Sequence, residues 1–341
     1  MRLHNAPLLI SGLFLCLLAC QPKVQPSSTQ PRTQLQDDTT FSIAFGSCSD
    51  EDKPQRLWEE ILAERPDAWV WLGDNIYGDS DKRNVLSRKY DKQKNHPLYL
   101  QLRAQTEILG VWDDHDYGVN DGGRHFHAKA MSQQVFLDFL DVPQTDSRRT
   151  REGTYHTTLI EKHGLSVRFI LLDARYFRDD MVKKKGRYEP NMDGTILGKA
   201  QWAWLSGILA SSQADYHVIA SGIQVLPTQH RFEKWANFPL ERVKLMDLMD
   251  SLYVNRPIFI SGDRHVGEIS KLRHKDQTLY DITSSSLTHG WSQRRPESNA
   301  LRQGELVYDI NYGLLLLSKD SAIALLKGED GQILESVTLE Y

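Results

Sequence analysis

The sequence predicts an α/β protein in which strands and amphipathic helices alternate along the chain. Short apolar runs typical of buried strands recur between segments with the 3.6-residue periodicity of helices. Several of these apolar runs end in Asp or His, at the end of the strand where open α/β sheets form their ligand sites. With 341 residues, of which 40% are hydrophobic, the chain can bury one large core. We therefore expect one large domain over residues 41–341.

The overall charge of the chain is close to balanced. It carries 41 Lys and Arg against 45 Asp and Glu, for a formal net charge of −4. This balance excludes nucleic-acid binding, or binding to an anionic membrane, through bulk charge. An anionic substrate must therefore be bound by local groups, and nothing in the sequence predicts a protein partner.

The first 19 residues have the pattern of a bacterial signal peptide. One Arg precedes an apolar run from Leu8 to Leu18, which is shorter than the roughly 20 residues of a membrane-spanning helix. The sequence "LLAC" is similar to the lipobox of lipoproteins, so Cys20 would become lipidated and anchor the protein to a membrane. A plain signal peptide cleaved near Ala19 remains the alternative. Either case predicts export.

Residues 20–40 are rich in Gln, Pro, Ser and Thr and offer almost no apolar surface. This composition predicts a disordered tether between the lipid and the domain. Gln21 directly after Cys20 is compatible with sorting to an outer membrane, so we expect a lipoprotein that faces the periplasm or lies in the outer membrane.

The first elements of the domain form a βαβ unit. Residues 41–47 read as a strand, residues 54–65 as an amphipathic helix and residues 67–74 as a second strand. Such a unit predicts two parallel strands. The rest of the chain predicts further helices at 97–105, 128–140, 197–210 and 240–253, and strands at 107–116, 154–161, 166–175, 216–222, 257–265, 267–274, 278–285, 312–319, 322–328 and 334–341. We expect the β-rich C-terminal third to complete a second sheet.

Reactive side chains follow four of the predicted strands, in "FGSCSD", "WLGDNIYGD", "VWDDHDYG" and "ISGDRH". They comprise Cys48, Asp74, Tyr77, Asp114, Asp263 and His265. Several carboxylates packed together would repel one another and lose hydration, and bound cations remove that cost. The pattern therefore predicts two metal ions, bridged by one carboxylate, with a hydroxide between them that attacks phosphorus.

Five ordered motifs, "GSCS", "GDNIY", "DDHD", "LGKAQWAWL" and "SGDRH", resemble those of the PhoD-like alkaline phosphatase D family, within the wider metallophosphoesterase superfamily. The resemblance covers roughly residues 41–312. It implies a four-layer αββα sandwich, with two mixed sheets flanked by helices, and hydrolysis of phosphate monoesters or diesters. It also implies iron and calcium as the cofactors.

The donor types divide between two sites. Cys48, Tyr77 and His265, together with Asp74, suit Fe³⁺, because strongly donating anionic ligands stabilise a trivalent ion. The second site would share Asp74 and add Asp114 and Asp263; its oxygen ligands suit Ca²⁺, with Mg²⁺ or Mn²⁺ as alternatives. Zn²⁺ remains the main rival at the first site. The superfamily's isolated middle His has no clear counterpart, although Gln224 lies near its place.

The resemblance also assigns His115 as the proton donor to the leaving group, with Asp116 orienting its ring or tuning its basicity. A hydrogen-bonded structural histidine is the alternative for His115. Arg175 and Arg264 are candidates for holding phosphate oxygens. Asn75 is a candidate for substrate binding or for the shell of the second metal, and a turn role is the alternative.

The leading hypothesis is therefore an exported lipoprotein phosphatase. One alternative is a phospholipase-type phosphodiesterase that acts on membrane or cell-wall diesters. Another is a metal-binding lipoprotein without catalysis. The sequence does not separate monoesters from diesters, because both classes use the same metal machinery.

Overall fold

The computed structural model describes Met1 and residues 38–341. The predicted signal peptide and most of the predicted tether lie outside the described residues. Among the described residues, no helix is both long and apolar enough to cross a membrane.

Two mixed sheets form the centre of the described domain. The first sheet contains, in spatial order, β15 (Ile333–Thr338), β14 (Ala322–Lys327), β13 (Tyr312–Leu317), β1 (Phe41–Gly46), β2 (Ala68–Leu72) and β3 (Glu107–Val111). The second contains β12 (Arg302–Val307), β10 (Gly267–His274), β11 (Gln277–Ser284), β9 (Pro257–Ser261), β8 (Tyr216–Ser221), β5 (Leu165–Leu171) and β4 (His156–Lys162). A small hairpin is formed by β6 (Lys183–Lys184) and β7 (Arg187–Tyr188), which pair with each other and not with a strand of either large sheet.

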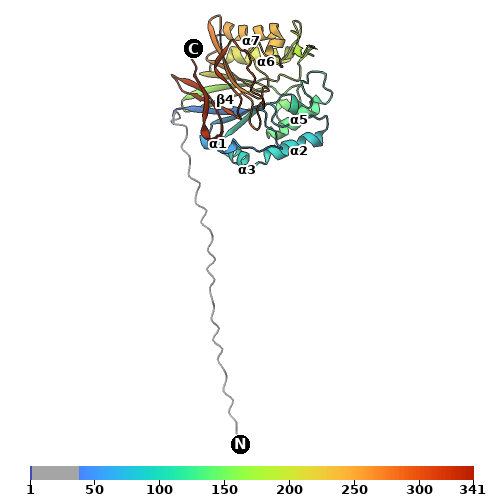
Figure 1. Cartoon of the computed structure of the whole chain (residues 1–341), viewed down its shortest axis with the longest axis vertical. Coiled ribbons are helices and arrows are strands. Elements are labelled where there is room, and N and C mark those ends of the chain that lie inside the picture. The colour runs from blue at the N-terminus through green and yellow to red at the C-terminus, as the bar shows by residue number, and fades with distance from the viewer. Residues whose placement is uncertain (2–37) are drawn as a thin grey trace. The chain divides into compact units, whose positions relative to one another are not determined.

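Helices cover the two outer faces, as Figure 1 shows, with α6 and α7 on one side and α1, α2, α3 and α5 on the other. Their bounds are α1 (Trp58–Glu64), α2 (Arg83–Lys94), α3 (Pro97–Arg103), α4 (Asp114–Tyr117), α5 (Lys129–Phe139), α6 (Gly198–Ser211) and α7 (Pro239–Ser251). Three short 3₁₀ turns span Ser147–Arg149, Trp235–Asn237 and Glu329–Gly331.

The buried apolar side chains separate into three clusters, which correspond to the spaces between four layers. One cluster joins side chains from both sheets, such as Val70 and Ile260. A second packs the first sheet against its helices and includes Trp71 and Phe139, and a third does the same for the second sheet with Leu205 and Leu245. Strand residues that point alternately to the two faces are apolar on both, as expected for sheets covered on each side. The predicted αββα layering is confirmed.

The parallel strands align their carboxyl ends at one edge of each sheet. β1, β2 and β3 are parallel in the first sheet, and β5, β8, β9 and β11 are parallel in the second. One expectation was wrong: of the C-terminal strands, β13, β14 and β15 extend the first sheet through an antiparallel pairing with β1. The loops that follow the parallel strands of the two sheets carry the candidate site.

Candidate metal centre

Backbone hydrogen bonds tie the strand-end loops of both sheets together. In the first sheet, the amide of Ser49 donates to the Asp74 carbonyl at 2.9 Å. In the second, the amide of Gly262 donates to the Gly222 carbonyl at 3.0 Å. The amide of Leu287 donates to the Ser47 carbonyl at 3.1 Å and so joins the two sheets. Side chains that are distant in sequence are thereby held at one edge.

Glycine permits the closest approach between these loops. A β-carbon on Gly222 would lie 2.4 Å from Asp113 Oδ1, and one on Gly73, where φ is +90°, would lie 2.4 Å from the β-carbon of Asp113. No larger residue fits at either position without displacing Asp113. The backbones after β2 and β8 can therefore enclose the carboxylate that follows β3.

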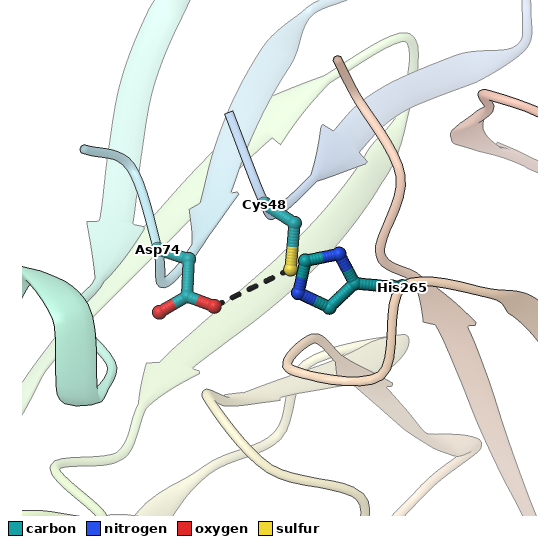
Figure 2. A group of neighbouring side chains, drawn as sticks. All are labelled: Cys48, Asp74 and His265. Carbon is teal, nitrogen blue, oxygen red and sulfur yellow. Dashed lines mark hydrogen bonds between the residues drawn. The ribbon is translucent and has the colours of Figure 1, made fainter. Parts of the chain in front are cut away.

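Cys48, Asp74 and His265 converge on one point, as Figure 2 shows. Their ligand atoms lie within 4.8 Å of one another, and Cys48 Sγ lies 3.3 Å from Asp74 Oδ2. Tyr77 joins them, with its hydroxyl 3.3 Å from His265 Nε2. The structure therefore brings together the four residues that the sequence analysis grouped as the first metal site.

A second set of carboxylates lies beside the first. Asp74 and Asp114 form a group of converging ligand atoms with His115, and Asp114 forms another with Asp113 and Asp263. Asp74 thus belongs to the Cys48 group and to the Asp114 group, which is the position expected of a bridging carboxylate. The predicted ligands of the second site also lie together.

Burial makes these acids costly to ionise without a cation. Desolvation, followed by the charges of Cys48 and Asp114, raises the pKa of Asp74, and desolvation with the charges of Asp113 and Asp114 raises the pKa of Asp263. Burial likewise raises the pKa of the Cys48 thiol to about 11, and Asp113 Oδ2 is buried with no hydrogen-bond partner among the described residues. Bound metal ions would offset each of these costs, so the residues present fit a two-metal centre.

Asp113 was not singled out in the sequence analysis, although "DDHD" contains it. It is fully buried, and its Oδ1 accepts a hydrogen bond from Arg175 Nε at 2.6 Å. One of its carboxylate oxygens lies within 4.8 Å of ligand atoms of Asp114 and Asp263. The residue near the place of the missing middle His, Gln224, instead donates from Nε2 to Thr283 Oγ1 at 2.7 Å. Asp113 is therefore the additional donor that the structure offers to the second site.

His115 lies next to both groups, but Asp116 does not orient it. Asp116 Oδ1 accepts from the backbone amides of Asn75 and Ile76 at 2.6 and 3.1 Å, so it holds the loop after β2. The ring of His115 contacts Asp79 instead, with Nδ1 2.8 Å from Asp79 Oδ1. This corrects the predicted role of Asp116.

The charge around His115 favours its protonated form. Burial opposes protonation, but the hydrogen bond to Asp79 and the charges of Asp74 and Asp114 raise the pKa of His115 to about 10. With Nδ1 engaged by Asp79, Nε2 is the ring atom left to donate a proton. The predicted proton donor therefore has a partner that fixes its ring.

Arg175 differs from its predicted role of holding phosphate oxygens. Its side chain is fully buried, with Nε on Asp113 and Nη1 2.6 Å from Glu233 Oε2. It therefore holds the Asp113 carboxylate in position through this ion pair. The sequence places Arg175 at the end of a predicted strand, but its carboxylate partner Glu233, 58 residues further along the chain, could not be predicted from the sequence.

The two candidate substrate-binding residues have different surroundings. Asn75 is fully buried; its Nδ2 donates to the Val111 carbonyl at 3.0 Å, as a structural turn residue would, while its Oδ1 has no hydrogen-bond partner among the described residues, as a ligand of the second metal would. Arg264 lines a cavity beside the centre, where its Nη2 lies 2.5 Å from Glu297 Oε1 and its Nε has no partner among the described residues. A further histidine, His289, was not predicted; its ring centroid lies 4.5 Å from that of His265.

Comparisons with known proteins place this chain among phosphatases. The family model for PhoD-like phosphatase matches residues 43–312. Alkaline phosphatase D of Bacillus subtilis (strain 168) is 30% identical over 297 residues, which cover 72% of this chain and 49% of that protein. The chain thus spans about half the length of this curated relative.

Two solved structures share the fold. A structure of PhoD matches 91% of this chain and 69% of its own, with a TM-score of 0.72 and 17% identity. Purple acid phosphatase PPD1 from yellow lupin (Lupinus luteus) seeds matches 92% of this chain and 55% of its own, with a TM-score of 0.59 and 12% identity. At these identities the likeness supports the fold, and it confirms the metallophosphoesterase type of sandwich.

Proposed function

Because the chain belongs to the PhoD-like phosphatase family, we propose that it hydrolyses phosphate monoesters, diesters or both at a centre of two metal ions. One observation carries the proposal: Asp74 and Asp114 each belong to more than one group of converging ligand atoms. Shared carboxylates of this kind hold two cations close together.

For the metals, we propose Fe³⁺ held by Cys48, Tyr77, His265 and Asp74, and Ca²⁺ held by Asp74, Asp114, Asp263 and Asp113. The thiolate, phenolate and imidazole donors favour the trivalent ion, and the oxygen donors favour calcium. Zn²⁺, Mn²⁺ and Mg²⁺ are the alternatives. When bound, the ions would supply a hydroxide for attack on phosphorus and neutralise charge on the phosphate.

Side chains of the protein would assist the departure of the leaving group and bind the phosphate. His115 Nε2 would give a proton to the leaving alkoxide oxygen as the ester P–O bond breaks, while Asp79 keeps Nδ1 bound and the ring in place. Arg264 would approach the phosphate from the neighbouring cavity, since its Nε is free of a hydrogen-bond partner. Arg175 would act indirectly, by holding Asp113.

For the location, we propose export and a lipid anchor at Cys20. The support is the sequence pattern of residues 1–19 and the polar composition of residues 20–40. A phospholipase-type diesterase would use the same centre. A metal-binding lipoprotein without turnover is disfavoured by the His115–Asp79 contact, because mere metal binding does not require an oriented proton donor.

The test is hydrolysis by the purified full chain loaded with iron and calcium. We expect release of nitrophenolate from p-nitrophenyl phosphate, from bis(p-nitrophenyl) phosphate or from both, and loss of this activity in Asp74→Asn. A chain that binds both metals but releases nitrophenolate from neither ester would support the non-catalytic alternative.

A further inference from the structure

A cavity of about 610 Å³ lies beside the candidate metal centre. It borders the centre, because Arg264, one of its lining residues, lies between Asp263 and His265 in the sequence. Trp291 also lines it, and the ring centroid of Trp291 is 6.3 Å from that of His265. A substrate with its phosphorus at the metals can therefore place a substituent in this cavity.

The lining of the cavity is strongly cationic. Arg187, Arg231, Arg264 and Arg295 line it, against one acid, Glu297. Glu297 pairs with Arg264, whereas the other three arginines have no carboxylate partner among the described residues. Because the whole chain has a slightly negative net charge, these arginines mark a local site for an anion. One guanidinium group can bind two phosphate oxygens at the same time.

Two residues that line the cavity, His230 and Arg264, carry buried polar atoms without hydrogen-bond partners among the described residues. His230 is 6% exposed, and neither ring nitrogen has a hydrogen-bond partner among the described residues. The buried Nε of Arg264 also lacks one. Unsatisfied buried donors are rare in native proteins and indicate a missing ligand or solvent partner.

The cavity also presents a flat aromatic surface. Trp291 is 40% exposed, yet its ring is fixed, because Nε1 donates to the Arg264 carbonyl at 2.7 Å. The ring of Phe232 lies 5.3 Å from Trp291, and the Arg264 guanidinium carbon lies 4.6 Å above Phe232. An exposed but immobilised Trp beside arginines is the combination on which nucleobases stack.

We infer that this cavity binds the nucleoside part of a phosphodiester, with the base on Trp291 and a second phosphate on Arg187 and Arg295. The inference rests on the proposed function, because the phosphorus attacked would lie at the metal centre. The oxygen of a water molecule that has lost a proton forms the new bond to that phosphorus, and the P–O bond to the other ester group breaks. That group departs as an alcohol after taking up a proton, or as the free anion when it is nitrophenolate, and the nucleotide keeps the phosphate. Substrates of this class are nucleotides that carry a phosphate besides the one attacked.

The test compares esters that share one leaving group. The p-nitrophenyl ester of thymidine 5′-phosphate, with and without a 3′-phosphate, is compared with p-nitrophenyl phosphate and p-nitrophenylphosphorylcholine, using the metal-loaded full chain. We expect kcat/KM to be highest for the ester with the 3′-phosphate. Arg295→Gln should lower the preference for the 3′-phosphate about tenfold, since a charged hydrogen bond is lost.

Two further variants separate base stacking from general damage. Trp291→Ala should lower the preference for the thymidine esters over p-nitrophenyl phosphate by about tenfold, and Trp291→Phe should restore much of it. Arg294→Gln is the matched control, because Arg294 pairs with Asp309 and does not line the cavity. It should leave both preferences within twofold of the unaltered chain.

Higher kcat/KM for p-nitrophenylphosphorylcholine than for the thymidine esters, or equal effects of Arg295→Gln and Arg294→Gln, would overturn the inference. In those cases nitrophenolate is still released, so the proposed function stands. If the metal-loaded chain hydrolyses none of the four esters, the proposed function fails and the inference fails with it.

Discussion

Four of the six predicted metal ligands adopt a backbone conformation that side-chain-bearing residues rarely occupy. Cys48, Asp74, Asp263 and His265 have φ angles of 55°, 48°, 72° and 55°. Each such residue costs about 1–3 kcal/mol relative to an ordinary conformation. Glycine would remove the strain but has no ligand atom. The strain accompanies the placement of these four side chains in the two neighbouring groups of ligand atoms at the ends of strands.

Asp79 is predicted to affect the hydrolysis rate by positioning the ring of His115. Asp79→Asn should weaken the contact that fixes the His115 ring and lower the pKa of that ring, because the carboxylate charge is lost. Hydrolysis of an alkyl ester such as glycerol phosphate should slow about tenfold to a hundredfold, since an alkoxide needs a proton to leave. Hydrolysis of p-nitrophenyl phosphate should change little, because nitrophenolate leaves without one.

The measurement is kcat for both esters in Asp79→Asn and in the control Asp81→Asn. Asp81 is an exposed acid on the same loop that pairs with His127. Equal slowing of both esters in Asp79→Asn would show that Asp79 supports the loop and not proton donation.

At the scale of elements, the loops after the strands depend on glycine where two backbones meet. Gly222→Ala would place a β-carbon 2.4 Å from Asp113 Oδ1 and 2.9 Å from the Trp112 carbonyl oxygen. We expect a lower melting temperature and a loss of bound metal, because Asp113 must move. Gly207→Ala is the control, since Gly207 lies inside α6 with open space around it. That change should stabilise the protein by about 0.5–1 kcal/mol.

Thermal unfolding and metal content of both variants check this prediction. Unchanged metal content in Gly222→Ala would contradict the role given to the Asp113 position.

Helices and strands with a clear pattern of apolar residues can be predicted from the sequence, and elements without such a pattern cannot. The βαβ unit of β1, α1 and β2 was predicted because its strands are continuous apolar runs. Helix α2 was missed because it buries only Leu86, Tyr90 and Gln93 and has mostly charged residues elsewhere. Strand β12 was missed since "RQGELV" contains polar residues and a glycine.

In the molecule as a whole, the contacts that could not be predicted from the sequence are those between segments that are distant in the chain. The six predicted metal ligands were identified because each follows a predicted strand. The partners of Asp113, Arg175 and His115 come from other segments whose contacts depend on the folded structure. The same applies to the C-terminal strands, whose apolar pattern suits either sheet.

The metal ions are predicted to stabilise the fold as a whole. Removing them with a chelator leaves the buried carboxyl groups of Asp74 and Asp263 close to other acids without a bound cation to offset their charge, so the chain should unfold at a temperature about 10 °C lower. Differential scanning calorimetry before and after chelation measures the shift, and adding iron and calcium back is the control. An unchanged melting temperature would show that the acids are already satisfied without cations.

Cys48 and Tyr77 are proposed to bind iron at a centre shared with a second metal. The most direct measurement is the metal content and visible spectrum of one preparation of the full chain, beside Tyr77→Phe and the control Tyr117→Phe. Tyr117 donates its hydroxyl to the Gly123 carbonyl at 2.9 Å. We predict iron with a broad charge-transfer band that is lost in Tyr77→Phe and kept in Tyr117→Phe. Zinc alone, with no visible band in any of the three proteins, would contradict the assignment.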